Sequence, residues 1–315
     1  MMTVDEFLNE WHSESNYVIG HTSGSTGKPK EIKLLKADMR ASANLTNNFF
    51  GITKDSVLML CLSPDYIAGK MMIVRAEEAH ARLLTEKPSN HPLEQHDGPT
   101  IDLLAIVPSQ ALWLVDHPNL LKCVRNIIVG GGEIHSELRK KLSSLSSRVY
   151  ATYGMTETCS HVALSRISET PQPFRALPPV TFEQDERNCL VINTPQFSFE
   201  KLATNDIVDL IDNTTFYWRG RFDNVINTGG IKVFPEEIER LISPMIDRRF
   251  YITSSPSEKW GQEVIIKIEG EPMSKTEQDE LMAKMSIVLS AYQRPKGMIF
   301  LHKFTETATG KVKRL

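Results

Sequence analysis

The sequence predicts an α/β protein that has a large domain built on a mostly parallel sheet and a small α+β domain in its final third. Compact apolar segments alternate with helical stretches over residues 16–152, which is the pattern of a parallel sheet with covering helices. From about Val180 the pattern changes to short strands joined by tight turns, which indicates a small β-rich subdomain. A helix that opens with a capping box at Ser274–Glu277 belongs to the final third.

The individual elements are expected in the following order. In the large domain we expect helices at 36–50 and 136–145 and strands at 16–22, 57–63, 103–107, 126–129 and 148–152. In the β-rich part we expect strands at 188–193, 206–211 and 215–219, with a hairpin loop at Asn213. Further on we expect helices from Pro235 to about 242 and from 274 to about 290, and strands at 250–253 and 263–268. Since ligands bind at the carboxyl ends of parallel strands, the Gly-rich turns that follow these strands are the candidate site.

Composition narrows the class of protein. The 315 residues favour two domains, and the formal charge of -3 gives no indication of a nucleic-acid partner. No apolar run is long enough for a membrane span, and the first residues lack the pattern of a signal peptide. The four cysteines (Cys61, Cys123, Cys159 and Cys189) form no C-x-x-C pair, so we expect reduced thiols in a cytoplasmic protein.

The segment Thr22–Lys30 has the composition of a phosphate-binding loop. Its four hydroxyls, two glycines and two lysines offer backbone N–H groups, side-chain donors and positive charge. The spacing is not that of a Walker A loop, and the chain contains no G-x-S-x-G nucleophile elbow. A flexible surface linker is the structural alternative, which the strand before the loop and the helix after it disfavour.

Four segments in the same order resemble the motifs of the adenylate-forming superfamily, which includes acyl-CoA synthetases, luciferases and peptide-synthetase adenylation domains. They are Thr22–Lys30, Tyr153–Glu157 (YGMTE), Arg219–Glu239 with its hinge and P-E-E-I-E motif, and Thr309–Arg314 (TGKVKR). The resemblance covers nearly the whole chain. It implies that ATP activates a carboxylic acid as an acyl-adenylate and that CoA then displaces AMP.

The resemblance also implies roles for individual residues. Lys311, Thr156 and Glu157 would be catalytic, with Lys311 bridging the carboxylate and the α-phosphate and Glu157 binding Mg²⁺. Tyr153 would stack on adenine, and Asp206 would hold the ribose hydroxyls with Arg221 nearby. The implied ATP- and AMP-binding set is Thr22, Ser23, Gly24, Ser25, Thr26, Gly27, Lys30, Gly131, Gly132, Glu133, Tyr153, Gly154, Met155, Thr156, Asp206 and Arg221.

Each of these assignments has a structural alternative. The alternatives are a core aromatic for Tyr153, an exposed acid for Glu157, a plain strand–helix turn for Gly131–Glu133, a surface arginine for Arg221 and a lysine on a frayed tail for Lys311. Two positions also depart from the motifs, because Asn205 replaces a glycine and Thr305-Glu306 replace a Pro-Arg pair.

The resemblance places a hinge at Asp223. It therefore implies an N-terminal adenylate-forming domain at 1–222, shortened at its start, and a mobile C-terminal domain at 223–315. After rotation of the C-terminal domain, Gly229 and Gly230 would line the tunnel for the pantetheine arm of CoA. The surface that a longer N-terminal stretch covers in other members is a candidate homodimer interface.

The early position of the phosphate loop, together with the segments 153–164, 65–72 and 223–227, resembles the 2-succinylbenzoate–CoA ligase subfamily of menaquinone biosynthesis. That acid carries a second carboxylate, which needs a cation or several donors. Lys70, Arg75 and His161 are the candidates, with exposed helix positions (Lys70, Arg75) and a hydrogen-bonded core histidine (His161) as alternatives. Other open readings are another acid–CoA ligase, an enzyme that loads a carrier protein, and a degenerate nucleotide-binding relic. A zinc enzyme is disfavoured because no H-E-x-x-H occurs.

Overall fold

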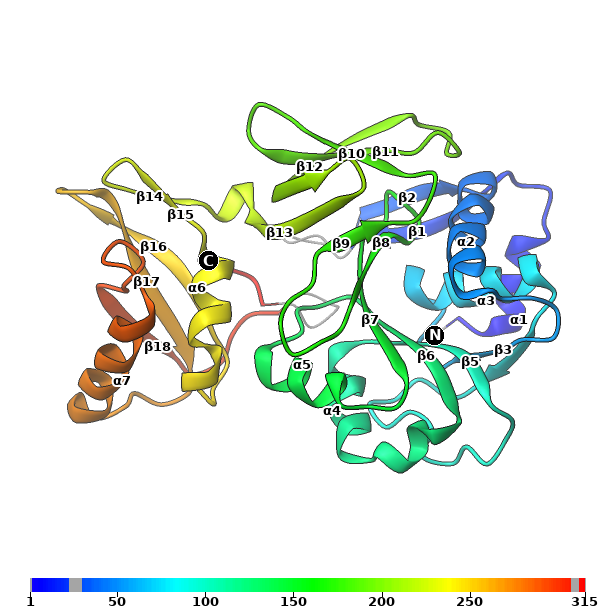
Figure 1. Cartoon of the computed structure of the whole chain (residues 1–315), viewed down its shortest axis with the longest axis horizontal. Coiled ribbons are helices and arrows are strands. Elements are labelled where there is room, and N and C mark those ends of the chain that lie inside the picture. The colour runs from blue at the N-terminus through cyan, green and yellow to red at the C-terminus, as the bar shows by residue number, and fades with distance from the viewer. Residues whose placement is uncertain (1, 23–29, 307–311, 315) are drawn as a thin grey trace.

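The computed structural model describes residues 2–22, 30–306 and 312–314. Within these residues the chain forms a two-stranded hairpin, an eleven-stranded mixed sheet and a five-stranded sheet. Figure 1 shows the five-stranded sheet and its helices, coloured yellow to red, beside the larger N-terminal part of the chain. Both the large sheet and the separate α+β unit were expected from the sequence.

Five strands of the large sheet are parallel and lie in the order β7-β6-β5-β3-β4. Their bounds are Arg148–Gly154, Val124–Val129, Ile101–Ile106, Val57–Leu60 and Arg82–Thr85. The predicted strands of the first half are confirmed, although β3 ends three residues before the predicted end. The carboxyl ends of β6 and β7 therefore lie side by side, and the turns that follow them carry Gly131–Glu133 and Met155–Ser160.

Helices cover both faces of this parallel part. On one face lie α1 (Val4–Trp11), α2 (Lys36–Phe50) and α3 (Ile67–Ala79), whose buried side chains share a core with Leu58 and Leu60. On the other face lie α4 (Pro108–Asp116), the 3₁₀ turn η1 (Pro118–Cys123) and α5 (Ser136–Ser143), which pack with Met59 and Cys61. Successive residues of β3 thus enter opposite cores, as the alternation of side chains along a strand requires.

The β-rich part continues the same sheet in antiparallel fashion. After β7, the strand β8 (His161–Arg166) pairs antiparallel with it, and β9, β13, β12, β11 and β10 follow in that spatial order. Their bounds are Phe174–Ala176, Thr215–Arg221, Lys201–Asp212, Cys189–Asn193 and Thr181–Gln184. The sheet is therefore mixed, because the short turn after β7 allows only an antiparallel neighbour. The hairpin β1 (Tyr17–Thr22) and β2 (Lys30–Leu35) lies apart from it.

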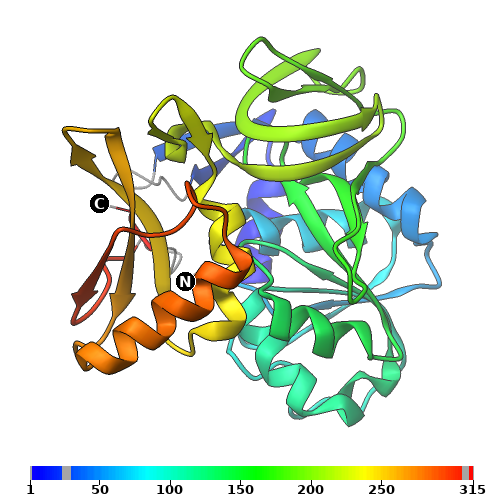
Figure 2. The same ribbon diagram turned by 60° about the vertical axis from the view of Figure 1, so that its left-hand side comes forward.

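The final third follows the 3₁₀ turn η2 (Phe222–Asn224) and has its own hydrophobic core. It contains β14 (Ile226–Thr228), β15 (Ile231–Val233), α6 (Pro235–Ile242), η3 (Ser243–Met245), β16 (Phe250–Ser257), β17 (Gly261–Glu269), α7 (Lys275–Val288) and β18 (Gly297–Leu301). The predicted capping box opens α7, because Ser274 and Glu277 each accept the backbone N–H of the other. Figure 2 shows α6, in yellow, between this sheet and the N-terminal part.

Cys61, Cys123, Cys159 and Cys189 are all free thiols, as expected. Among the helices of the described residues, none combines the length and the apolar character needed to cross a bilayer.

Candidate active site

The turn after β7 holds the Tyr153–Glu157 motif in a compact loop. The buried Thr158 hydroxyl accepts the Met155 N–H at 3.0 Å and donates to the Ser160 carbonyl at 2.7 Å, which closes the turn. Gly154 is required here, because a Cβ at this position would lie 2.3 Å from the Ser160 carbonyl oxygen. Cys159 has a left-handed φ of 60°, a conformation that costs free energy in a residue other than glycine. Contacts among the loop's own residues thus define its shape in the structure.

Tyr153 and Asp206, which are 53 positions apart in the chain, meet at this end of the sheet. The Tyr153 hydroxyl donates to Asp206 Oδ2 at 2.8 Å, and its ring packs against Phe174 and Phe216, which also stack on each other. Burial raises the pKa of Tyr153 well above its usual value, and the Asp206 carboxylate acts in the same direction. Tyr153 is therefore buried like a core aromatic, and its hydroxyl also contacts Asp206, a residue predicted to bind the nucleotide.

Arg221 lies opposite Asp206 in the β12–β13 ladder. Its guanidinium donates to Asp223 Oδ2 at 3.0 Å in η2, and Asn205 Nδ2 reaches the same carboxylate at 3.3 Å. Although burial alone would lower it, the neighbouring carboxylates of Asp223 and Asp206 raise the pKa of Arg221. Asn205, the departure from the family glycine, thus forms part of the connection to the predicted hinge.

Glu157 and the Gly131–Glu133 turn lie at neighbouring strand ends. The Glu157 side chain is exposed and makes no hydrogen bond or ion pair with any residue that the structure describes. An exposed carboxylate of this kind fits Mg²⁺, which prefers oxygen ligands and retains waters. Gly131 has a φ of 80°, so the turn needs glycine there, and Glu133 lies within electrostatic reach of Arg314 and Arg240.

Arg75 and His161 come together in the interior of the large domain. Arg75 Nη2 donates to Ser160 Oγ at 2.5 Å, and that oxygen lies 3.2 Å from His161 Nδ1. His161 Nε2 lies 3.1 Å from Thr46 Oγ1. His161 is therefore a buried histidine with hydrogen-bond partners, which was the structural alternative to a role in the acid site. Burial lowers the pKa of Arg75 to about 9, and among the described residues no carboxylate pairs with it.

Lys70 points elsewhere. Its ammonium lies 3.8 Å from Glu10 Oε2 and 4.7 Å from the centre of the Phe7 ring, both on α1. The structure therefore does not place Lys70 with Arg75 and His161. The alternative that Lys70 and Arg75 are exposed helix residues is also wrong. Helices α1 and α2 cover α3, and both side chains are 2% exposed.

Several predicted residues cannot be located. Ser23, Gly24, Ser25, Thr26, Gly27 and Lys311 lie outside the described residues. Thr22 and Lys30 are paired at the ends of β1 and β2, on either side of the loop. In the C-terminal unit, Gly229 and Gly230 form the left-handed turn between β14 and β15, and the Gly229 N–H donates to the Trp260 carbonyl at 2.9 Å.

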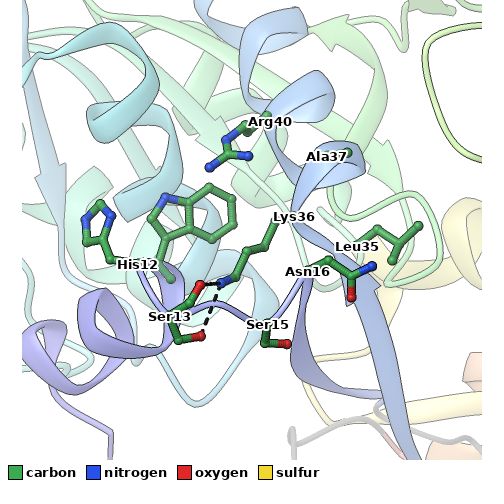
Figure 3. A pocket seen from close by; sticks show the side chains of 9 residues that line it. His12, Ser13, Ser15, Asn16, Leu35, Lys36, Ala37 and Arg40 are labelled. Carbon is green, nitrogen blue, oxygen red and sulfur yellow. Dashed lines mark hydrogen bonds between the residues drawn. The ribbon is translucent and has the colours of Figure 1, made fainter.

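A hollow of about 400 Å³ lies at the other end of the β1–β2 hairpin (Figure 3). Its cations already have partners: Lys36 Nζ donates to the Ser13 carbonyl at 2.8 Å, and Arg40 Nε donates to Glu78 at 3.2 Å. The rise over the five residue steps from Tyr17 to Thr22 puts this hollow roughly 17 Å from the end of β1 where the phosphate loop begins. It is therefore not the predicted nucleotide site.

Sequence reasoning missed three side chains that shape this region. Trp218 Nε1 donates to Asp206 Oδ1 at 3.1 Å, Thr158 closes the motif turn, and Ser160 joins Arg75 to His161. Thr158 and Ser160 were within reach of sequence reasoning, because they directly follow the Tyr153–Glu157 motif. Trp218 directly precedes the Arg219–Glu239 segment, but nothing in the sequence indicated that its side chain would reach Asp206.

Comparison with known proteins identifies a matching family. The model of the AMP-binding enzyme family matches residues 5–183. Curated relatives include 2-succinylbenzoate–CoA ligases of Lactococcus lactis (25% identical, covering 97% of this chain and 71% of the relative) and of Listeria monocytogenes (26%, covering 98% and 71%).

Solved structures show the same likeness. An acyl-CoA synthetase (AMP-forming)/AMP-acid ligase II-like protein from Dyadobacter fermentans is 32% identical, with a TM-score of 0.66 and coverage of 98% of this chain and 91% of that one. The O-succinylbenzoate CoA synthetase of Bacillus subtilis, solved with ATP and a magnesium ion, has a TM-score of 0.81 at 19% identity and covers 94% and 68%. The extent of the family match and the close likeness to the Dyadobacter protein lead to one conclusion: the chain belongs to the AMP-binding enzyme family.

Proposed function

We propose that this AMP-binding enzyme is an acid–CoA ligase and that its acid is 2-succinylbenzoate. In the first half-reaction a carboxylate oxygen of the acid attacks the α-phosphorus of ATP, and pyrophosphate leaves. In the second, the thiol sulfur of CoA attacks the acyl carbonyl, loses its proton and displaces AMP. The chain's task in the first step is to align the acid and to offset charge at phosphorus.

The nucleotide half of the proposal is supported by the residues at the end of β7. Asp206 would accept the ribose hydroxyls, Arg221 would lie beside them, and Thr156 would contact the α-phosphate. The exposed Glu157 carboxylate would hold Mg²⁺, which supplies charge neutralisation on the phosphates. Since Tyr153 is buried with its hydroxyl on Asp206, it would meet adenine with one part of the ring while fixing the ribose ligand.

One observation carries the choice of acid: the buried Arg75 guanidinium lacks a carboxylate partner among the described residues. A buried charge without a counter-charge is unfavourable, and a planar guanidinium is suited to a carboxylate. Arg75 contacts Ser160, three residues after Glu157, so the proposed acid site adjoins the proposed magnesium ligand. A dicarboxylic acid would place one carboxylate at Arg75 and present the other for activation. Lys70, which faces α1, is left out of this site.

The C-terminal unit would serve the second half-reaction. The domain boundary would fall between residues 222 and 223, with Asp223 as the hinge and with Gly229 and Gly230 lining the path of the CoA thiol. Support comes from the separate hydrophobic core after η2 and from the contact of Asp223 with Arg221 at the proposed nucleotide site.

The test is a panel of acids assayed for ATP-dependent pyrophosphate release, with and without CoA. The panel contains 2-succinylbenzoate, the two analogues that each lack one of its carboxylates, benzoate, acetate and a fatty acid. We expect the fastest release with 2-succinylbenzoate and formation of its thioester only with CoA. A preference for acetate, benzoate or a fatty acid would overturn the choice of acid. Thioester formation on a carrier protein but not on CoA would favour the carrier-loading alternative.

A variant at Arg75 tests the acid site itself. Arg75→Met removes the charge while keeping an unbranched side chain in the same interior position, and we expect the KM for 2-succinylbenzoate to rise about 100-fold, as for a lost charged hydrogen bond. The KM for ATP should stay within about twofold. The matched control is Arg166→Met, an exposed arginine at the end of β8, which should leave both constants unchanged. An unchanged KM for the acid in Arg75→Met would refute this site.

A further inference from the structure

Both oxygens of the Asp206 carboxylate already accept a hydrogen bond from the protein. The Tyr153 hydroxyl donates to Oδ2 at 2.8 Å, and the Trp218 indole Nε1–H donates to Oδ1 at 3.1 Å. Asp206 is 8% exposed, so these contacts are largely shielded from water. The backbone N–H of Asp206 is also fixed, because it donates to the Thr204 hydroxyl at 3.0 Å. The carboxylate therefore has a defined orientation before any nucleotide arrives.

An irregularity in the ladder brings Trp218 to this carboxylate. Asp206 is opposite Arg221 and Ile207 is opposite Gly220, but Val208 is opposite Trp218, so Arg219 is an extra residue on β13. In a regular strand, positions 218 and 221 would point to opposite faces because they are an odd number apart. The bulge changes this alternation and puts Trp218 and Arg221 on the face of Asp206. Redirecting one side chain is a common use of a bulge beside a functional site.

The remaining capacity of the carboxylate matches a diol. An ionised carboxylate offers about four acceptor positions, two on each oxygen, and two of them are used by Tyr153 and Trp218. No other described residue donates to this carboxylate, so one position is left on each oxygen. The indole N–H can only donate, so Trp218 cannot compete as an acceptor for an incoming hydroxyl.

We propose that Trp218 is a positioning residue for the nucleotide: its indole N–H orients Asp206 so that each carboxylate oxygen accepts one of the two vicinal hydroxyls of the ATP ribose. This rests on the proposed function only in taking Asp206 as the ribose ligand. Trp218 itself acts through Asp206 and would not touch the reacting atoms.

The test compares ATP with 2′,3′-dideoxy-ATP on the wild type and on Trp218→Phe, which keeps an aromatic ring but removes the N–H. We expect the KM for ATP to rise about tenfold in the variant, with kcat within about twofold, as for one lost charge-assisted hydrogen bond. With the dideoxy nucleotide the two proteins should have the same KM, because that ligand lacks the hydroxyls that Asp206 accepts. Tyr217→Phe is the matched control, since Tyr217 is the exposed neighbour on β13, and it should change neither value.

The other outcomes are equally decisive. An equal loss with both nucleotides in Trp218→Phe would mean that the tryptophan only supports the fold, and an unchanged KM for ATP would exclude any role. Tyr153→Phe removes the other donor, and its loss should also depend on the ribose hydroxyls, which gives a second test if Trp218→Phe folds poorly. Calorimetric titration with both nucleotides gives the same comparison without turnover. Failure of acid activation and failure of the Trp218 proposal are therefore separate results.

Discussion

Arg314 and Glu239 form a bidentate ion pair that joins the C-terminal segment to α6. Arg314 Nη1 donates to Glu239 Oε1 at 2.8 Å and Nη2 donates to Oε2 at 2.6 Å. Oε1 also accepts the Ile252 N–H at 2.6 Å. Glu239 belongs to the P-E-E-I-E motif and Arg314 to the T-G-K-V-K-R motif, so this pair connects two of the sequence motifs that were recognised separately.

This ion pair predicts that replacing Arg314 lowers the stability of the fold more than breaking an exposed ion pair does. Burial raises the pKa of Glu239 to about 7 even though the Arg314 guanidinium opposes the shift, so the carboxylate is poorly solvated. In Arg314→Ala the carboxyl must either stay charged without its main partner or take up a proton, and at a pH above the pKa of Glu239 we expect the free energy of unfolding to fall by about 3 kcal/mol. Urea denaturation of the wild type and the variant measures this change in the free energy of unfolding. The control is Lys275→Ala, which breaks an exposed pair with Asp279 on α7 and should cost about 0.5 kcal/mol or less. Equal costs in the two variants would contradict the assignment.

His161 predicts a specific loss of stability in acid. Burial lowers the pKa of His161 well below its usual value, and the Arg75 guanidinium acts in the same direction. Below about pH 6.5 the unfolded chain binds a proton at this histidine while the folded chain does not, so stability falls as the pH falls. The free energy of unfolding falls by up to about 1.4 kcal/mol per pH unit in this range. Above about pH 6.5 the contribution of His161 no longer changes with pH.

The measurement is the free energy of unfolding between about pH 5 and 7. The groups that face the imidazole are Arg75, Ser160 and Thr46, and His161→Gln can keep a hydrogen bond to either hydroxyl. We expect the wild type to lose more stability than His161→Gln over this range. His302→Gln, at a 91% exposed histidine, should follow the wild type. Parallel curves for the wild type and His161→Gln would refute a buried neutral histidine.

The sequence predicted which residues would gather at the carboxyl end of β7 better than it predicted their neighbours. Asp206 and Arg221 were expected to share a nucleotide site with Tyr153 because their segments resemble motifs of a known family, and the structure brings all three together. The mixed nature of the sheet was not readable, because antiparallel strands such as β8 pair by position in space and not by composition. Trp218 was missed for a related reason: a bulge reverses the side-chain alternation on which such reasoning depends.

The contrast between Lys70 and Arg75 shows a second limit. Five residues along a helix turn the side chain by roughly 140°, so the two cations of α3 face different surroundings. The sequence offered both for an acid site, but α1 covers the Lys70 side, where Glu10 and the Phe7 ring stabilise the ammonium. Within the part of the chain that the structure describes, the packing of α1 distinguishes a lysine with a partner from an arginine that lacks a carboxylate.

The remaining prediction concerns Lys311, which lies outside the described residues but between two fixed points of the chain. On one side Glu306 accepts from Arg249 at 2.6 Å and is paired with Val312 in a β-bridge; on the other side Arg314 is bound by Glu239. Glu306, the departure from the family arginine, therefore has its own cationic partner.

If Lys311 offsets the charge on the pentavalent phosphorus, Lys311→Ala should lower the rate of acyl-adenylate formation on the order of 10²–10³-fold, the usual effect of one lost electrostatic donor. Thioester formation from preformed acyl-adenylate should survive, because that step no longer forms a bond to phosphorus. Pyrophosphate exchange and single-turnover thioester formation measure the two steps separately. Lys313→Ala, two residues further on, is the control and should leave both rates near those of the wild type. A Lys311→Ala variant that loses both half-reactions equally would show that the lysine supports the fold or the nucleotide site in general and not the adenylation step.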